Sequence, residues 1–266
     1  MLYNLYRISD AGREKEKITG ATKINCLKNF ISVFGTEGLF VFADNCSEGT
    51  IKQIKELGIE PVLINLGNAG SFRHIVDFAL AKFNDNDQVY LVEDDYWHLP
   101  ASKQALLEGL EIADYVTLYD HSDKYVSFSK KGGNPYVTNN SEKSRVFLSH
   151  TCHWKISNST SMTFATRLSV LKADKEVMWR FTQQNIPEDF GMFLILTRQS
   201  PFPLYKAKVF RHLFKLSLKY LFNATLKKRV LITALPGLST HIENAYLSPH
   251  TDWEIIIQKF DENQPK

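Results

Sequence analysis

The sequence predicts an α/β fold, in which a mostly parallel central sheet carries helices on both of its faces. Over roughly the first 120 residues, short apolar segments alternate with longer amphipathic ones, an order typical of parallel strands joined by helices. The short segments are continuous apolar runs, as expected for parallel strands that are buried on both faces. Residues that begin and end helices stand at the boundaries of the longer segments.

The expected elements follow one another regularly from the N-terminus. Ser47 is a suitable N-cap for the second helix, and Gly58 is a suitable C-terminal stop for it. The expected strands cover residues 2–8, 39–43, 61–66, 89–92 and 115–119, and the expected helices cover residues 21–34, 47–57, 71–83 and 106–113.

The second half of the chain has a less regular pattern. Residues 122–140 are polar and contain glycines, which is typical of a loop or hairpin. Residues 187–197 predict a helix that begins at Pro187, because the first turn of a helix tolerates proline. Residues 210–222 predict a basic amphipathic helix, and residues 238–253 form a polar and aromatic C-terminal segment. We expect a single domain over residues 1–266, regular to about residue 120 and less regular beyond it.

The charge is unevenly distributed along the chain. The net charge is only +3, but no acidic residue occurs between Asp189 and Glu243, and Lys206 to Arg229 holds eight Lys and Arg residues. This region favours an anionic partner. One interpretation of the 206–229 basic helix is peripheral contact with the inner face of a membrane, and the other is an ordinary solvated helix. No nucleic-acid-binding motif accompanies it, so we expect no nucleic acid partner.

The cysteines and the hydropathy pattern bear on location. Cys26, Cys46 and Cys152 form no CxxC pair, which favours free thiols and a reducing compartment. The N-terminal segment lacks the pattern of a secretory signal, and no apolar run approaches the roughly 20 residues of a membrane span. We therefore expect a cytoplasmic protein.

Polar residues directly follow three of the expected strands. Asp44 follows the second strand, Gly67 and Asn68 follow the third, and an acidic triplet at residues 93–95 follows the fourth. In open α/β sheets, ligands bind outside the carboxyl ends of the strands. We expect these residues to converge on one crevice.

The acidic triplet is Glu93-Asp94-Asp95, with no Lys or Arg in the adjacent residues. Two carboxylates about 4 Å apart repel by about 4 kcal/mol at an effective dielectric of about 20. A divalent cation relieves this repulsion, and Mg²⁺ or Mn²⁺ prefers carboxylate and phosphate oxygens. The triplet therefore suits a site shared by a metal and a diphosphate, and the alternative interpretation is a solvated acidic turn.

The triplet and its preceding strand resemble the DxD-type motif of GT-A glycosyltransferases, particularly those similar to family 2. Four other segments resemble landmarks of that family, in the same order: residues 42–47, 68–74, 187–189 and 239–243. The order of these short motifs carries the resemblance. The chain departs from the usual pattern in having Glu93 at the first DxD position, and residues 6–9 where many members have a proline-led turn.

The resemblance implies a GT-A-like (Rossmann-like) fold and a metal-dependent glycosyltransferase using Mn²⁺ or Mg²⁺. The donor would be a nucleoside-diphosphate sugar, with UDP favoured, and the acceptor a glycan or a lipid-linked glycan. The implied metal ligands are Glu93, Asp95 and His241, with His250 as a second choice for the histidine. The implied donor-binding residues are Arg7, Asp44, Arg73 and Asp94.

Each of these roles has a simpler competitor. Asp44 would accept a hydrogen bond from the base, but it also suits an Asx turn. Arg73 would neutralise the diphosphate, but it also suits a solvated helix surface. Asp189 would deprotonate the acceptor and make the enzyme inverting, although acids are common in the first turn of a helix. A retaining enzyme, a nucleotidyltransferase and a non-catalytic nucleotide- or glycan-binding protein remain as alternatives.

Overall fold

The computed structural model of the chain describes residues 1–12, 16–128, 133–223 and 225–262. Its central element is a nine-stranded sheet in the order β3-β2-β1-β4-β11-β6-β12-β10-β9. The strands are β1 (Leu2–Ser9), β2 (Leu39–Asp44), β3 (Val62–Ile64), β4 (Gln88–Glu93), β6 (Tyr115–Thr117), β9 (Val146–Leu148), β10 (His153–Ser157), β11 (Phe164–Arg167) and β12 (Leu231–Leu235).

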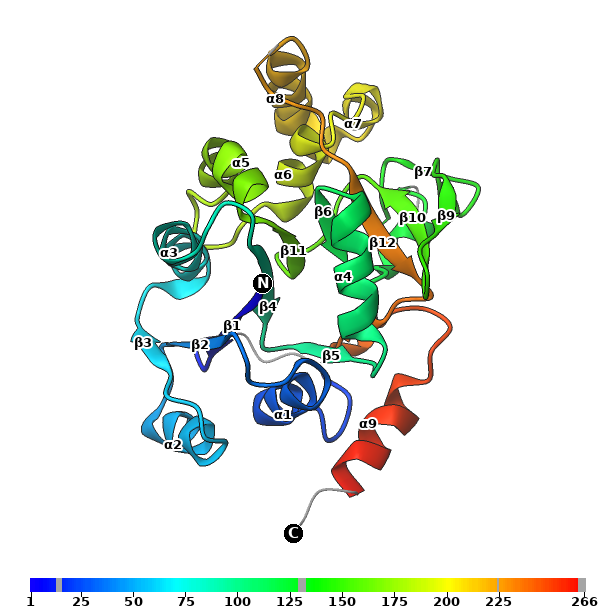
Figure 1. Cartoon of the computed structure of the whole chain (residues 1–266). Coiled ribbons are helices and arrows are strands. Elements are labelled where there is room, and N and C mark those ends of the chain that lie inside the picture. The colour runs from blue at the N-terminus through cyan, green and yellow to red at the C-terminus, as the bar shows by residue number, and fades with distance from the viewer. Residues whose placement is uncertain (13–15, 129–132, 224, 263–266) are drawn as a thin grey trace.

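Helices cover both faces of this sheet (Figure 1). The helices are α1 (Lys23–Phe34), α2 (Glu48–Glu56), α3 (Gly67–Lys82), α4 (Ser102–Ile112), α5 (Leu168–Phe181), α6 (Asp189–Leu196), α7 (Phe202–Lys206), α8 (Arg211–Leu221) and α9 (Trp253–Glu262). Short elements complete the described part: β5 (Tyr96–His98), β13 (Ser239–His241), β7 (Val137–Thr138), β8 (Ser141–Glu142), η1 (Ser122–Tyr125), η2 (Lys208–Phe210) and η3 (Asn244–Tyr246).

The strand directions confirm the predicted α/β class. β3, β2, β1 and β4 are mutually parallel, and β6 and β12 are parallel to each other. β11 is antiparallel to both β4 and β6, and β10 is antiparallel to both β12 and β9. Within the described residues, only β10 and β11 of the nine strands therefore run against the common direction, so the sheet is mostly parallel.

Alternation along the central strands divides the core between the two faces. Leu5 and Leu91 pack against α3, α5 and α6 on one face. Their neighbours Tyr6 and Val92 pack against α1, α2 and α4 on the other face. Because both faces are covered, the neighbouring residues Leu5 and Tyr6, and likewise Leu91 and Val92, are all apolar and buried.

Several helix boundaries follow from local chemistry. The Thr22 side chain caps α1 by accepting the Asn25 amide hydrogen at 3.1 Å. The Ser47 side chain caps α2 by accepting the Thr50 amide hydrogen at 3.2 Å, as predicted. Gly58 follows α2 with a φ of 77°, a left-handed conformation that glycine adopts without strain.

Three predicted helix starts are wrong. α4 begins at Ser102 rather than at residue 106, because the Ala105 amide already donates to the carbonyl oxygen of Ala101 at 3.1 Å. α3 begins at Gly67 rather than at residue 71, because Gly67 takes a φ of 69° and turns the chain directly into the helix. α6 begins at Asp189 rather than at Pro187. The reason is that Glu188 is not helical, and its amide donates to the carbonyl oxygen of Phe181 at 2.9 Å.

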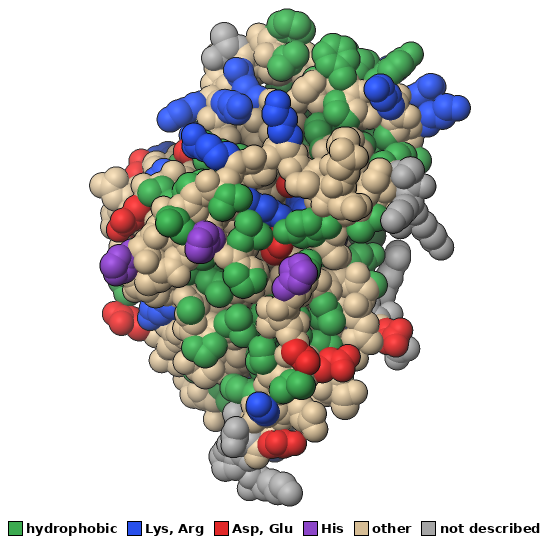
Figure 2. All heavy atoms as spheres, turned by 90° about the vertical axis from the view of Figure 1, so that its right-hand side faces the viewer, with side chains coloured by type: hydrophobic (Ala, Val, Ile, Leu, Met, Phe, Trp, Pro, Cys, Tyr) green, Lys and Arg blue, Asp and Glu red, His purple; other side chains and the backbone are tan. Residues whose placement is uncertain are grey.

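The 206–229 basic segment is not one helix. Lys206 ends α7, η2 follows, and α8 covers residues 211–221 as the periodicity predicted. α7 and α8 lie together at one end of the molecule, where Lys and Arg side chains gather (Figures 1 and 2). No helix in the described ranges has both the length and the apolar character that a membrane crossing requires.

Candidate functional site

Pairing among the parallel strands brings their carboxyl ends together at one edge of the sheet, where Glu93 lines a cavity of about 240 Å³ that Asp44, Gly67 and Asn68 do not line. Ser9 at the end of β1 is in register with Asp44 at the end of β2. Arg7 is in register with Glu93 at the end of β4. The acidic triplet therefore lies at the edge of the sheet where the rule for open α/β folds places ligands.

The three acidic side chains of the triplet have different surroundings. Glu93 lines a cavity. Asp94 is buried, and its Oδ2 accepts the Ser9 amide hydrogen at 2.8 Å and lies 3.8 Å from Lys23 Nζ. Asp95 Oδ2 lies 3.0 Å from His241 Nε2. The triplet is thus not one cluster of parallel carboxylates.

A small two-stranded sheet brings His241 to Asp95. β13 pairs with β5 in antiparallel fashion, with His241 opposite Tyr96. The Ile242 amide donates to the carbonyl oxygen of Asp95 at 2.9 Å. His250, the second choice from the sequence, is exposed and does not line the cavity. Of the two histidines considered, the structure therefore brings His241 to the triplet.

Burial makes Glu93 and Asp94 hard to ionise. Burial, followed by the charge of Asp95, raises the pKa of Glu93 to about 8 despite the opposing charge of Arg7. Burial and the same Asp95 charge raise the pKa of Asp94 to about 6, although Lys23 opposes the shift. Carboxyl groups with raised pKa values at the end of a strand are typical of a functional site.

The residues present fit a metal ion only if a substrate supplies further ligands. Among the described residues, no group of three His, Cys, Asp or Glu side chains is arranged to hold a metal. Asp95 Oδ2 and His241 Nε2 are 3.0 Å apart, close to the roughly 3 Å between neighbouring ligands of an octahedral ion with bonds of about 2.1 Å. Mg²⁺ commonly takes one or two protein ligands and completes its shell with phosphate oxygens and water.

The protonation of His241 bears on this fit. The Glu243 amide donates to His241 Nδ1 at 3.1 Å. In a neutral ring this places the proton on Nε2, which then donates to Asp95. For a metal to bind Nε2, the ring proton must move to Nδ1. The Glu243 amide can then no longer donate to Nδ1 and must turn away from the ring.

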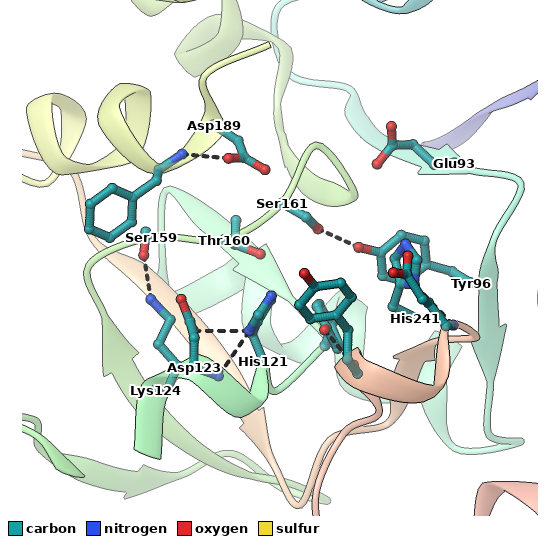
Figure 3. A pocket seen from close by; sticks show the side chains of 14 residues that line it. Glu93, Tyr96, His121, Asp123, Lys124, Ser159, Thr160, Ser161, Asp189 and His241 are labelled. Atoms are coloured by element: carbon teal, nitrogen blue, oxygen red, sulfur yellow. Dashed lines mark hydrogen bonds and ion pairs between the residues drawn. The ribbon is translucent and has the colours of Figure 1, made fainter. Parts of the chain in front are cut away.

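A cavity of about 240 Å³ lies beside the triplet (Figure 3). Its wall combines the end of β4, the start of α6, η1, the segment 159–161 and the region around β13. The lining residues are Glu93, Tyr96, Tyr119, His121, Asp123, Lys124, Ser159, Thr160, Ser161, Asp189, Phe190, His241, Glu243 and Tyr246.

Asp189 lies in the cavity wall, at the first residue of α6. Its Oδ1 accepts the Phe190 amide hydrogen at 2.6 Å. Burial raises the pKa of Asp189 to about 6, although the Phe190 hydrogen bond and the charge of His121 oppose the shift. Figure 3 shows the carboxyl groups of Asp189 and Glu93 turned toward each other. An acid with a pKa near neutrality is suited to accept a proton.

Opposite Asp189, the segment around η1 supplies charged side chains. His121 Nδ1 lies 3.0 Å from Asp123 Oδ1, and the other ring nitrogen of His121 points into the cavity (Figure 3). Burial raises the pKa of Asp123, but the His121 hydrogen bond and the Lys124 charge outweigh it and lower the pKa below its ordinary value. Lys124 Nζ is buried against Asn158 at 2.9 Å and Glu142 at 3.1 Å.

All four predicted donor-binding residues bind other parts of the protein; Asp94 accepts the Ser9 amide hydrogen, and Arg7 donates to Asp44. Asp44 is fully buried, and Arg7, Asn45 and the amides of Leu66 and Gly67 all donate to it. These partners are not those of an Asx turn, in which the side chain accepts the amide hydrogen of the residue two positions on. Burial raises the pKa of Asp44, but the Leu66 amide and Arg7 outweigh it, and the pKa is lowered overall.

Arg73 contacts the C-terminal end of α5. Its Nε donates to Thr182 Oγ1 at 2.9 Å, and its Nη2 donates to the carbonyl oxygens of Trp179 and Thr182. Arg73 does not line the cavity, and neither the diphosphate role nor the solvated-surface alternative describes this position.

The part of the cavity between β6 and η1 was not predicted from the sequence. Tyr119, His121 and Asp123 come directly after a strand that was predicted. The rule that pointed to Asp44 and to the triplet applies equally to these residues, because β6 runs in the same direction as β4. No comparable signal in the sequence identifies residues 159–161 or Tyr246.

No family model and no curated protein matches the chain. Solved structures that resemble it include a CMP:2-keto-3-deoxy-manno-octonic acid synthetase complexed with CTP, with 13% identity, 99% of each chain covered and a TM-score of 0.47. The galactosyltransferase LgtC, with donor and acceptor sugar analogues, has 13% identity, coverage of 100% of this chain and 97% of that one, and a TM-score of 0.46. Residues 1–349 of S. aureus TarS have 12% identity, coverage of 84% and 70%, and a TM-score of 0.42. TM-scores of this size decide nothing about function.

Proposed function

We propose that this protein is a metal-dependent glycosyltransferase. It would move a sugar from a nucleoside-diphosphate sugar, with UDP favoured, to a hydroxyl group of a glycan or lipid-linked acceptor. The observation that carries the proposal is the pairing of Asp95 with His241 at 3.0 Å, because His241 lines the same cavity as Asp189. Two potential ligands for a metal–diphosphate complex and a potential base thus lie in one site.

The reaction assigns one role to each side of this site. The acceptor oxygen forms a bond to the anomeric carbon, while the bond from that carbon to the diphosphate oxygen breaks. The nucleoside diphosphate leaves with the electron pair, and Asp189 receives the proton of the acceptor hydroxyl group. Attack on the face opposite the leaving group inverts the anomeric centre.

The departing diphosphate needs compensation for its charge. Asp95 and His241 would hold Mn²⁺ or Mg²⁺ together with the diphosphate oxygens, and the ion would act there as a Lewis acid. Glu93, the third ligand that the sequence implied, lines the cavity with His241 and Asp189 (Figure 3), but in the described part of the chain it does not form a three-ligand cluster with Asp95 and His241.

Two polar groups support binding of a ligand beside the triplet. Arg7 Nε is buried and has no hydrogen-bond partner in the described part of the chain. Thr160 Oγ1, in the cavity wall, is also buried without a hydrogen-bond partner among the described residues. Since buried polar groups are nearly always satisfied, these atoms are suited to bind ligand oxygens. Tyr119 and Tyr246 add the aromatic surface that ligand pockets commonly present.

His121 is a second candidate for the base. Its Nδ1 accepts the Asp123 amide hydrogen at 3.0 Å, while its other nitrogen faces the cavity (Figure 3). We assign the role to Asp189 because its raised pKa of about 6 matches a base that works near neutral pH. Comparing the turnover rates of the Asp189→Asn and His121→Gln variants decides between the two residues. Loss of the base should lower the rate by on the order of 100-fold or more.

A donor screen tests the proposed function. The protein is incubated with UDP-, GDP- and dTDP-sugars and Mn²⁺, with and without EDTA, and release of nucleoside diphosphate is followed. Slow hydrolysis of the donor is sufficient as a signal. The variant is Asp95→Asn, and the matched control is Asp77→Asn, an exposed aspartate whose partner is Lys175.

We expect release from one donor, loss of release with EDTA or Asp95→Asn, and unchanged release with Asp77→Asn. Absence of both release and calorimetric binding for every donor would refute the transferase. Binding without release, even with added glycan acceptors, would favour the non-catalytic alternative.

A further inference from the structure

The end of the molecule formed by α7, η2 and α8 carries an unusual combination of side chains. Five large apolar residues are exposed there, with Phe222 at 82%, Val209 at 73% and Phe202 at 69%. Tyr205 and Leu221 are the other two. Seven exposed cations accompany them: Lys206, Lys208, Arg211, Lys215, Lys219, Lys227 and Lys228. We call these twelve residues the basic end.

The positive charge of the basic end is not neutralised by the protein itself. None of its seven cations forms an ion pair with an acidic residue in the described part of the chain. The sequence from residue 190 to residue 242 contains no acid at all. Arg229 belongs to the same basic run, but it is buried against Asp174 and is not part of the surface.

The apolar residues of the basic end are distinct from the apolar face of α8. Leu213 is buried, and Phe214 and Leu216 pack against the main core. α8 thus uses its own apolar face to cover the protein. The exposed apolar side chains come from α7, from η2 and from the C-terminal end of α8, and Figure 2 shows hydrophobic and basic side chains intermingled at this end. An ordinary solvated helix does not require these exposed phenylalanines.

We propose that the basic end binds the surface of an anionic lipid bilayer. Lys and Arg side chains near a bilayer surface are attracted to anionic headgroups, and exposed Phe, Leu and Val side chains insert at the boundary between headgroups and acyl chains. Both requirements are met by one continuous stretch of chain. A second copy of this protein is a poorer partner, because a symmetric contact would bring two sets of seven cations together.

The basic end also lies next to the cavity. The ring of Phe190, which lines the cavity, is 5.3 Å from the ring of Phe210 in η2. Glu188, just before α6, is 2.7 Å from His212 in α8. Binding at the basic end therefore holds the cavity close to the bilayer, where a lipid-linked acceptor would be. The lipid binding itself does not depend on the proposed function.

Vesicle sedimentation with the full chain tests the proposal, without donor or metal. The vesicles contain phosphatidylcholine alone, or phosphatidylcholine with 30 mol% phosphatidylglycerol as an approximate composition for an anionic surface. One variant, Lys215→Gln with Lys219→Gln, removes charge. Another, Val209→Ser with Phe222→Ser, removes apolar surface. The matched control, Lys52→Gln with Leu63→Ser, changes an exposed lysine and an exposed leucine elsewhere.

We expect binding to anionic vesicles only, and weaker binding in high salt. Each removed lysine should weaken binding roughly fivefold. The Val209/Phe222 variant should also bind more weakly, and the control should bind like the unmodified protein. All of these sites are exposed, and circular dichroism checks that each variant is folded.

Three results would overturn the proposal. They are no binding to anionic vesicles, equal binding to neutral and anionic vesicles, and a loss of binding in the control variant equal to that in the other two variants. Tighter binding to a single-stranded oligonucleotide than to the vesicles, or dimerisation abolished by Phe222→Ser, would assign the basic end to another partner. Donor turnover that persists in a protein that does not bind vesicles would separate this failure from failure of the proposed function.

Discussion

Replacing Asp189 with Asn should make the protein more stable at pH 8 while abolishing activity. Burial raises the pKa of Asp189 from an ordinary 3.8 to about 6, so folding favours the protonated acid over the carboxylate. Below about pH 4, Asp189 is protonated in both the folded and the unfolded protein, so its burial does not lower the free energy of unfolding. As the pH rises through 6, the folded protein must hold a charge that it disfavours.

The magnitude follows from the same pKa. At about 1.36 kcal/mol per pH unit, the difference between 3.8 and about 6 corresponds to about 3 kcal/mol above pH 6. Asp189 is partly exposed, so solvent reduces this value and we expect about 1 to 3 kcal/mol. Asn has the same shape and retains an oxygen that accepts the Phe190 amide hydrogen, so the end of α6 should not change.

The assay is urea unfolding of the unmodified protein and of Asp189→Asn, at pH 4.5 and at pH 8. We expect the variant to gain stability at pH 8, and to gain only about a third to two thirds as much at pH 4.5. If Asp189 serves only as a favourable charge at a helix N-terminus, the variant should instead lose about 0.3 to 1 kcal/mol at pH 8. That loss would refute the reasoning, and it would remove the case for Asp189 as the base.

The remaining predictions concern rate and stability. The rate of donor turnover should fall about tenfold per pH unit below about pH 6, as Asp189 becomes protonated; a flat profile would contradict this. In urea unfolding, Arg229→Met should cost about 3 to 5 kcal/mol because it leaves the Asp174 carboxylate buried without its cation, and adding Asp174→Asn should recover part of the loss. Gly191→Ala should cost about 1 to 3 kcal/mol in thermal unfolding, because a Cβ there would lie 2.7 Å from two neighbouring side chains. Thr22→Ala should cost about 1 kcal/mol through loss of the α1 cap, and an unchanged midpoint for either variant would contradict these assignments.

The first half of the fold could be predicted because its signals are local. β2 and β4 contain continuous apolar runs, β1 is apolar with polar interruptions, and Thr22, Ser47 and Gly58 mark helix ends by their own chemistry. The second half depends on contacts between distant residues. β11 enters the sheet between β4 and β6, and nothing within its four residues indicates those neighbours. β5 and β13 are similarly short and exist because they pair with each other.

The candidate site divides along the same line. Residues that follow a predicted strand could be found, which is why the triplet was identified. Periodicity does not show which hydrogen-bond partners a side chain has. The sequence therefore did not reveal that Asp44 and Arg73 form hydrogen bonds with other groups of the protein. Nor does it show that the segment 159–161 reaches the cavity, since no motif marks it. His241 was found only through a resemblance, and its position beside Asp95 comes from the pairing of β13 with β5.

The most direct test of the account is whether Mn²⁺ and UDP bind together at Asp95. UDP is titrated into the unmodified protein and into Asp95→Asn by calorimetry, with Mn²⁺ present and with EDTA. The account predicts that Mn²⁺ tightens UDP binding at least roughly tenfold in the unmodified protein, and that the variant loses this gain. UDP binding that is equally tight with and without Mn²⁺, or a gain that survives in the variant, would contradict a metal–diphosphate site at the triplet.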